Sequence, residues 1–167
     1  MILPPSPAAP DQPSVIFVCW GNICRSPMAE RIAERMARDA GLDVTFTSAA
    51  TSTEELGRPI DRRAARVLRA AGYRAADHSA HQITADEIDR ADLVVAMERL
   101  HLDRMRRLAP DAENLALMTD FDPTATPGTG IADPWYGPDS GFEAVKKQLE
   151  RAMPGLLAWV RAEQTRV

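Results

Sequence analysis

The sequence is poor in the residues that build extracellular or membrane-bound scaffolds. Its only two cysteines, Cys19 and Cys24, lie too close together to staple a fold and are too few for a zinc site made of thiolates alone. No apolar run is long enough to cross a bilayer, and no block of Lys or Arg is long enough to mark a nucleic-acid or anionic-lipid surface. We therefore expect a cytoplasmic protein that binds neither nucleic acid nor membrane, in which at least one cysteine has a chemical role.

The chain is long enough for one ordinary domain with its own core. Its 167 residues include 20 basic and 24 acidic side chains, so the protein is mildly negative. Residues 1–13 (MILPPSPAAPDQP) are rich in Pro and Ala and lack the basic start and apolar run of a secretory signal. We predict a disordered leader over residues 1–13 and a single domain over residues 14–167.

Short apolar segments alternate with segments of helical periodicity along the domain. Strands are predicted at 14–19, 43–48, 91–97 and 114–118, and helices at 26–40, 61–71, 98–108, in a short segment after Thr84, and from Ser140 to the C-terminal region. Ser26 predicts a helix cap, Thr84 with Glu87 and Ser140 with Glu143 predict capping boxes, and Pro154 predicts a kink. The alternation predicts an α/β fold, a single doubly wound domain whose four-stranded parallel sheet has helices on both faces and binds ligands at the carboxyl ends of its strands.

The run CWGNICRSP, residues 19–27, lies between the first buried strand and a helix start. A loop that wraps a helix N-terminus turns backbone N–H groups and the positive end of the helix dipole toward a tetrahedral oxyanion. Gly21 permits close backbone approach, and Asn22 tolerates the left-handed conformation that such a loop often requires. The same field would favour the thiolate of Cys19, and the planar fork of Arg25 matches two phosphate oxygens.

This run resembles the phosphate-binding loop of the low-molecular-weight protein tyrosine phosphatases, and the similarity extends from about Val15 to Trp159. The resemblance implies hydrolysis of protein phosphotyrosine and small aryl phosphates through a cysteinyl-phosphate, with no metal and no cofactor. It implies that Cys19 is the nucleophile and Arg25 the catalytic phosphate ligand. The resemblance also assigns the phosphate-binding loop to Trp20, Gly21, Asn22, Ile23, Cys24, Arg25 and Ser26. It implies that Ser26 hydrogen-bonds the sulfur and that Asn22, Ser48 and His78 support the loop. Finally, it implies that Cys24 is the cysteine that traps an oxidised nucleophile in a disulfide.

A thiolate phosphatase also needs an acid for the leaving group, and one carboxyl can serve as acid and then as base. A long aperiodic segment before residue 140 contains Asp133-Pro134-Trp135-Tyr136-Gly137. On the residues alone, Asp133 is hard to separate from an ordinary turn aspartate. The family's acid loop has an Asp followed by Pro and aromatics, so the resemblance implies that Asp133 is the acid and that Trp135 and Tyr136 line the cleft.

Two positions depart from the family pattern. Trp20 follows the nucleophile, where the family commonly has a small or aliphatic residue, and Glu54 stands where many relatives carry a substrate-contacting Trp. We predict that both side chains form the cleft wall. An acidic rim of this kind would disfavour acidic phosphopeptides.

Three alternatives follow from the same scaffold. A thiol-linked arsenate reductase needs further cysteines, and none follows Cys24; a phosphoarginine phosphatase tends to carry Thr where Ile23 stands. A non-catalytic phosphopeptide-binding module would lack the nucleophile or the acid. The expected partners are phosphotyrosine-containing proteins, and a monomer is expected although the sequence leaves the oligomeric state open. The run Arg62-Arg63 with Arg66 and Arg69 is predicted to be the solvated face of a helix.

Overall fold

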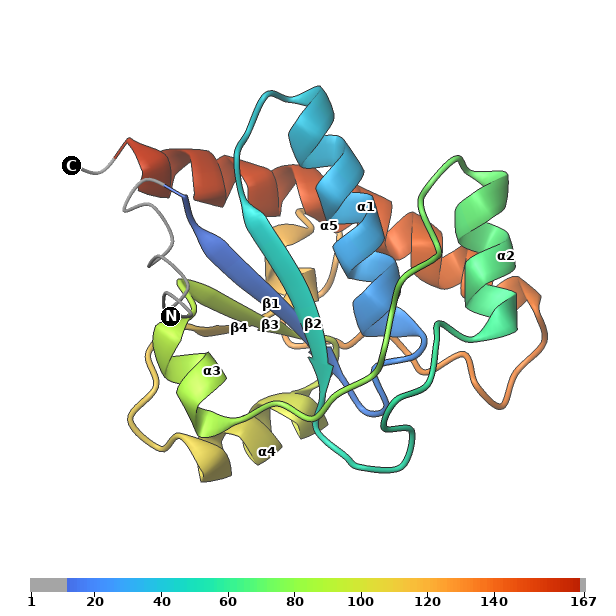
Figure 1. Cartoon of the computed structure of the whole chain (residues 1–167). Coiled ribbons are helices and arrows are strands. Elements are labelled where there is room, and N and C mark those ends of the chain that lie inside the picture. Colours follow the sequence, from blue (N-terminus) through green and yellow to red (C-terminus); the bar gives the residue numbers. More distant parts are fainter. Residues whose placement is uncertain (1–11, 166–167) are drawn as a thin grey trace, which may run out of the picture.

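Four short apolar strands form a fully parallel sheet in the computed structural model, which describes residues 12–165. The strands are β1 (Ser14–Cys19), β2 (Thr45–Ala50), β3 (Leu93–Ala96) and β4 (Leu115–Leu117), in the order β2-β1-β3-β4. Cys19 pairs with Ala50 on β2, and Val18 pairs with Ala96 on β3. The strands therefore end along one edge, and the loops that follow them meet there (Figure 1).

Both faces of the sheet are covered by helices (Figure 1). On one face lie α1 (Arg25–Asp39) and α5 (Ser140–Gln164), with α2 (Arg62–Ala70) packed against both of them; on the other lie α3 (Ala85–Arg90) and α4 (Arg99–Leu108). Because side chains alternate along a strand, Phe17 of β1 enters the first core and Val18 the second. The predicted fold class, a doubly wound α/β fold with a four-stranded parallel sheet, is confirmed.

The predicted boundaries need several corrections. The Ser26 cap is wrong, because Cys24 occupies the cap position of α1 and the Ser26 hydroxyl turns toward the Cys19 sulfur. The Ser140–Glu143 capping box is also wrong: Ser140 is already helical, and the cap residue Asp139 accepts no side-chain hydrogen bond there. Strand β2 runs two residues later than predicted, and a 3-10 turn, η1 (Met118–Phe121), follows β4.

Other local predictions are correct. The capping box of α3 forms between Thr84 and Glu87, and α2 begins after Asp61, whose carboxylate accepts the backbone N–H groups of Arg63 and Ala64. Helix α5 continues through Pro154, and the kink predicted there stays a prediction. The Thr84–Glu87 capping box depends on contacts within four residues, which is why the sequence alone predicts it, whereas the Asp61 cap was not predicted.

The leader predicted for residues 1–13 lies largely outside the described residues, which begin at Gln12. Pro13 is buried, and its carbonyl accepts a hydrogen bond of 2.9 Å from the Thr45 amide, which prolongs the β1–β2 pairing by one step. No helix within residues 12–165 is both long enough and apolar enough to span a membrane.

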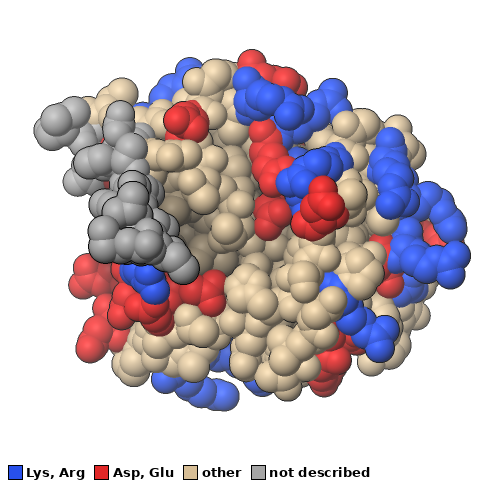
Figure 2. Space-filling view, in the orientation of Figure 1, with Lys and Arg blue, Asp and Glu red and all other residues tan. Residues whose placement is uncertain are grey.

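The surface carries charges of both signs, and basic side chains gather over α2 at the right of Figure 2. Arg62, Arg66 and Arg69 are exposed, as predicted for a solvated helix face. Arg63 departs from that prediction. Its side chain is 28% exposed and bends over the ring of Trp135, so the helix presents three of its four arginines to solvent.

Candidate active site

The loop between β1 and α1 surrounds the sulfur of Cys19 with hydrogen-bond donors. The Ser26 hydroxyl lies 3.0 Å from Cys19 Sγ, and the Ser26 amide lies 3.4 Å from it. Asn22 Nδ2 donates to Ser26 Oγ at 2.8 Å, and this oxygen also lies 3.5 Å from the Ala49 carbonyl, so the hydroxyl has two neighbours to which it can donate, Cys19 Sγ and that carbonyl. The Ser26 amide, the Ser26 hydroxyl and the N-terminus of α1 thus all lie beside one sulfur.

Asn22 shapes this loop, and the segment 78–81 holds it from outside. The backbone of Asn22 is left-handed, with φ of 60°. His78 Nε2 lies 2.6 Å from the Asn22 carbonyl, and the His81 amide donates to Asn22 Oδ1 at 3.2 Å. Burial lowers the pKa of His78, so the neutral ring donates through Nε2–H to that carbonyl.

Ser48 of β2 was predicted to support the site, and its side chain contacts helix α1. Its hydroxyl donates to Glu30 Oε1 at 2.9 Å, and burial raises the pKa of Glu30. The neighbouring Arg31 donates to the Ala76 carbonyl at 2.9 Å, just before His78. Ser48 therefore contacts α1 rather than the phosphate loop itself.

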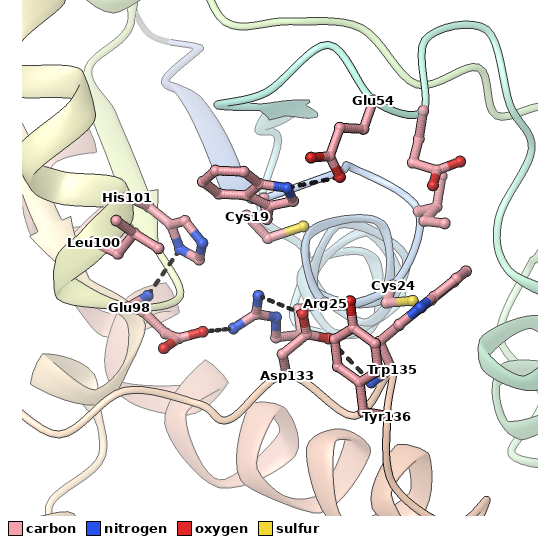
Figure 3. A pocket seen from close by; sticks show the side chains of 14 residues that line it. Cys19, Cys24, Arg25, Glu54, Glu98, Leu100, His101, Asp133, Trp135 and Tyr136 are labelled. Atoms are coloured by element: carbon pink, nitrogen blue, oxygen red, sulfur yellow. Dashed lines mark hydrogen bonds and ion pairs between the residues drawn. The ribbon is translucent and has the colours of Figure 1, made fainter.

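The guanidinium group of Arg25 lies between Glu98 and Asp133 in the cleft (Figure 3). Its NH1 group pairs with the Glu98 carboxylate and donates to the Ile131 carbonyl at 2.8 Å, and its NH2 group is 3.6 Å from Asp133 Oδ2. The side chain is 3% exposed. Only a residue with several fixed donors can hold these partners and still offer an edge to a phosphate.

Glu98 was not predicted from the sequence, although a signal existed. It follows the apolar strand β3 by two residues, and β3 is the neighbour of β1, so its position at the carboxyl edge places it beside the phosphate loop. The Glu98 amide donates to His101 Nδ1 at 3.0 Å. This contact caps the first turn of α4, so Glu98, the ion-pair partner of Arg25, is fixed to that helix.

His101 was also not predicted as a site residue. Its ring is fully buried and lines the cleft, and its Nε2 atom has no hydrogen-bond partner within residues 12–165. Burial, with Arg25 and Arg104 nearby, lowers the pKa of His101 to about 3. The ring is therefore neutral near pH 7, and its Nδ1 lone pair is free to accept from Glu98.

Asp133 lies on the loop of residues 122–139 between η1 and α5, which we call the acid loop. Its Oδ1 atom accepts the Trp135 amide at 3.1 Å, and its other oxygen faces Arg25. Asp120 and Asp122 instead accept hydrogen bonds from their own turns, Asp120 from the Leu117 amide and Asp122 from Thr124. Of these three aspartates, Asp133 is the one that lines the cleft.

The cleft has a volume of about 420 Å³. It brings together every residue predicted for the catalytic group and the cleft wall, and four that were not predicted. The predicted residues are Cys19, Trp20, Arg25, Glu54, Asp133, Trp135 and Tyr136, with Gly21, Ile23 and Cys24 of the loop; the others are Glu55, Glu98, Leu100 and His101.

The rim residue Trp20 is held on two sides. Its Nε1 donates to Glu54 Oε2 at 3.1 Å, and the guanidinium of Arg104 lies 4.6 Å from the centre of its ring. Arg104 in turn donates to the Thr51 carbonyl at 3.1 Å. Opposite, Trp135 is 38% exposed and Tyr136 is 93% exposed, so aromatic surface borders the opening from the acid loop.

Cys24 lies in the same loop and is a free, buried thiol, as is Cys19. Burial, followed by the carboxylate of Asp61, raises the pKa of Cys24 well above its ordinary value. Cys24 thus stays protonated near neutral pH. Cys19 and Cys24 share one loop but differ in their contacts, because the Ser26 hydroxyl and amide lie beside the Cys19 sulfur.

A strand–loop–helix that presents a cysteine, an arginine and an oxyanion-binding loop is the arrangement expected of a cysteine-dependent phosphatase. The family model described as low molecular weight phosphotyrosine protein phosphatase matches residues 14–166. The low molecular weight protein-tyrosine phosphatase A of Mycobacterium tuberculosis is 44% identical over 149 residues, covering 87% of this chain and 90% of its own. That of Streptomyces coelicolor is 43% identical over 155 residues, covering 89% and 94%.

A solved structure of a protein tyrosine phosphatase from Entamoeba histolytica superposes with a TM-score of 0.86 at 27% identity, covering 92% of this chain and 99% of that one. The chain belongs to the low-molecular-weight phosphotyrosine protein phosphatase family. Its activity is that of a low-molecular-weight protein-tyrosine phosphatase, and its substrates are phosphotyrosine proteins.

Proposed function

We propose that the phosphatase reaction proceeds through a phosphoryl group carried on Cys19, with Arg25 as phosphate clamp and Asp133 as acid and base. The observation that carries this proposal is the meeting of three groups in one cleft. The Cys19 sulfur lies 3.0 Å from the Ser26 hydroxyl at the start of α1, and Arg25 NH2 lies 3.6 Å from Asp133 Oδ2. Nucleophile, cation and acid then stand where an aryl phosphate could contact all three.

In the first step the Cys19 thiolate attacks phosphorus, the S–P bond forms and the P–O(aryl) bond breaks. Backbone N–H groups of the loop and Arg25 stabilise the equatorial oxygens, and protonated Asp133 gives its proton to the departing phenolate. In the second step Asp133 takes a proton from water, which attacks phosphorus and releases phosphate and the thiolate. No step calls on a metal or a cofactor.

For the protein substrate, we propose that Trp20, Trp135 and Tyr136 flank the phosphotyrosine ring and that Glu54 disfavours acidic flanks. The hydrogen bond from Trp20 to Glu54 fixes the carboxylate at the rim. Phosphopeptides that differ only in the charge of the residues next to phosphotyrosine test this. Acidic flanks should raise KM, Glu54→Gln should reduce the difference, and a preference for acidic flanks in the unmodified enzyme would contradict the assignment.

We propose that Cys24 is the redox partner of the nucleophile. If peroxide oxidises the Cys19 thiolate to a sulfenic acid, the Cys24 thiol can displace hydroxide from it, so that a disulfide and water form. Because burial keeps Cys24 protonated, it reacts only after the first oxidation. Peroxide treatment followed by thiol reduction should restore activity in the wild type but much less in Cys24→Ala.

Two free thiols at the centre of activity fit a reducing compartment. On that ground we propose a cytoplasmic location. We also propose that residues 14–167 act as one domain and as a monomer, and sedimentation of the full chain tests the latter.

Turnover of p-nitrophenyl phosphate in the presence of a metal chelator tests the catalytic assignment. Cys19→Ser should abolish turnover, and Asp133→Asn should slow it by about 100-fold or more for poor leaving groups, within the range of acid–base catalysis. Arg69→Gln, a change at an exposed residue of α2, is the matched control and should stay active. An inactive wild type, or a Cys19→Ser variant with undiminished activity, would refute the proposal.

A further inference from the structure

Arg63 makes contacts that set it apart from the other arginines of α2. Its NH1 group donates to the Trp135 carbonyl at 3.1 Å, and its guanidinium plane lies 5.0 Å from the centre of the Trp135 ring. The same guanidinium lies 4.5 Å from the ring of Phe142, a fully buried residue in the first turn of α5. The Arg63 side chain of α2 therefore contacts both the acid loop and the first turn of α5.

Asp61 connects Arg63 to the phosphate loop. Its two carboxylate oxygens accept from Arg63 Nε at 3.2 Å and from Arg63 NH2 at 3.3 Å. The Asp61 amide donates to the Ile23 carbonyl at 2.9 Å, in the middle of the phosphate loop. The residue that orients Arg63 is thus itself fixed to the loop that holds the nucleophile.

The path ends at the acid. The Trp135 amide donates to Asp133 Oδ1 at 3.1 Å. Trp135 therefore binds Arg63 through its carbonyl and Asp133 through its amide. Ile23, Asp61, Arg63, Trp135 and Asp133 form one chain of direct contacts between the two halves of the site. Within residues 12–165, no other arginine of α2 forms a hydrogen bond with the backbone of the acid loop, and Arg66 lies 3.9 Å from the Asp139 carboxylate.

We propose that Arg63 is a positioning residue that sets the acid loop in register with the phosphate loop and so places Asp133 for protonation of the leaving group. The inference rests on the proposed role of Asp133. Arginine suits the position because its several N–H groups bind the Asp61 carboxylate and the Trp135 carbonyl at once, while its guanidinium carbon lies over the rings of Trp135 and Phe142. Lysine would keep the charge but could not hold all of these partners.

The test is the dependence of kcat/KM on the leaving group, measured with aryl phosphates whose phenols span a wide range of basicity. Arg63→Lys should lose about tenfold with the most basic phenols, as expected for a small misplacement of an acid, and little with activated phenols that need no proton. Arg69→Gln, a change on the exposed face of the same helix, is the matched control and should follow the wild type. The inhibition constant of inorganic phosphate should stay unchanged in Arg63→Lys because the phosphate loop is intact.

A double variant separates positioning from a general structural effect. If Arg63 acts through Asp133, Arg63→Lys with Asp133→Asn should be no slower than Asp133→Asn alone. Equal losses for all leaving groups, or additive losses in the double variant, would overturn the proposal. Asp61→Asn keeps a helix-capping side chain but weakens the paired hydrogen bonds to Arg63, so it should show the same loss of kcat/KM with basic phenols. It replaces Arg63→Lys in the test if that variant folds poorly.

The outcomes also distinguish this inference from the function on which it depends. If Asp133→Asn itself shows no greater loss with basic phenols, the proposed acid is wrong. If Asp133→Asn shows that loss while Arg63→Lys and Asp61→Asn do not, the acid stands and the positioning role of Arg63 is wrong.

Discussion

Protonation of His101 should be a main cause of acid unfolding in this protein. The ring is fully buried, accepts the Glu98 amide at Nδ1, and has the guanidinium groups of Arg25 and Arg104 nearby. A proton on Nδ1 would break the hydrogen bond from the Glu98 amide that begins α4. It would also place a third positive charge beside Arg25 and Arg104. Both effects act against the charged ring, in agreement with a pKa lowered to about 3.

The sign and size of the effect follow from linkage. The unfolded chain binds a proton at His101 near pH 6.5 and the folded protein only near pH 3, so the unfolded state is favoured as the pH falls between them. Stability from this residue is fully present above pH 6.5. Between pH 7 and pH 4 the loss is roughly 3 kcal/mol, a large part of the roughly 5–15 kcal/mol that stabilises a typical domain.

Urea unfolding followed by circular dichroism at several pH values between 7 and 4 measures this loss. His101→Asn keeps a carbonyl that can accept the Glu98 amide but cannot take up a proton, so its stability should fall by roughly 3 kcal/mol less than that of the wild type over this range. Other groups with shifted pKa values, such as Glu30 and Asp122, titrate in both proteins and cancel in the difference. Parallel profiles for the two proteins would refute the reasoning.

Three further predictions concern stability and use the same unfolding assay. Gly155→Ala should destabilise by about 2 kcal/mol or more, because the added Cβ would lie 2.3 Å from the Phe121 carbonyl oxygen; Gly137→Ala, whose nearest contact is 3.9 Å, is its control, and equal effects would contradict the clash. Thr84→Ala should cost about 1 kcal/mol through loss of the α3 capping box, and no change would mean that the cap is not stabilising. Leu149→Ala should cost about 2–5 kcal/mol by leaving a cavity under α5, and a cost below 1 kcal/mol would show that the site collapses.

The central part of the fold was predictable because its signals are local. The run from Ser14 to Cys19 is apolar throughout, which indicates a strand buried on both faces, and β1 is indeed the strand between β2 and β3. Helix caps that depend on one side chain were predicted well at Thr84 and poorly at Ser26. The Ser26 hydroxyl had two possible partners, the helix backbone and the Cys19 sulfur, and only the folded loop decides between them.

The predicted site residues share a different kind of signal. Cys19 and Arg25 belong to one loop whose residues suit an oxyanion, whereas Asp133 needed the family resemblance to separate it from Asp120 and Asp122. Glu98 and Arg63 were missed because their roles come from contacts between elements far apart in the chain, and His101 was missed because its burial beside Arg25 appears only in the folded protein. Glu98 lies 73 residues from its partner Arg25, and Arg63 lies 72 residues from Trp135.

The position of the acid loop explains why such long-range contacts matter here. The phosphate loop follows β1, which pairs on both sides, but the acid loop follows β4, a three-residue edge strand, and reaches the site only after a 3-10 turn and further irregular chain. Its backbone is tied to the end of β3 by the Ile131 amide, which donates to the Met97 carbonyl at 2.8 Å. Arg25 holds the Ile131 carbonyl from the phosphate loop, and Arg63 holds the loop from α2. Because the sheet fixes Cys19, while the loop of Asp133 depends on one backbone hydrogen bond and on the side chains of Arg25 and Arg63, substitutions outside the cleft should affect the proposed acid more readily than the proposed nucleophile.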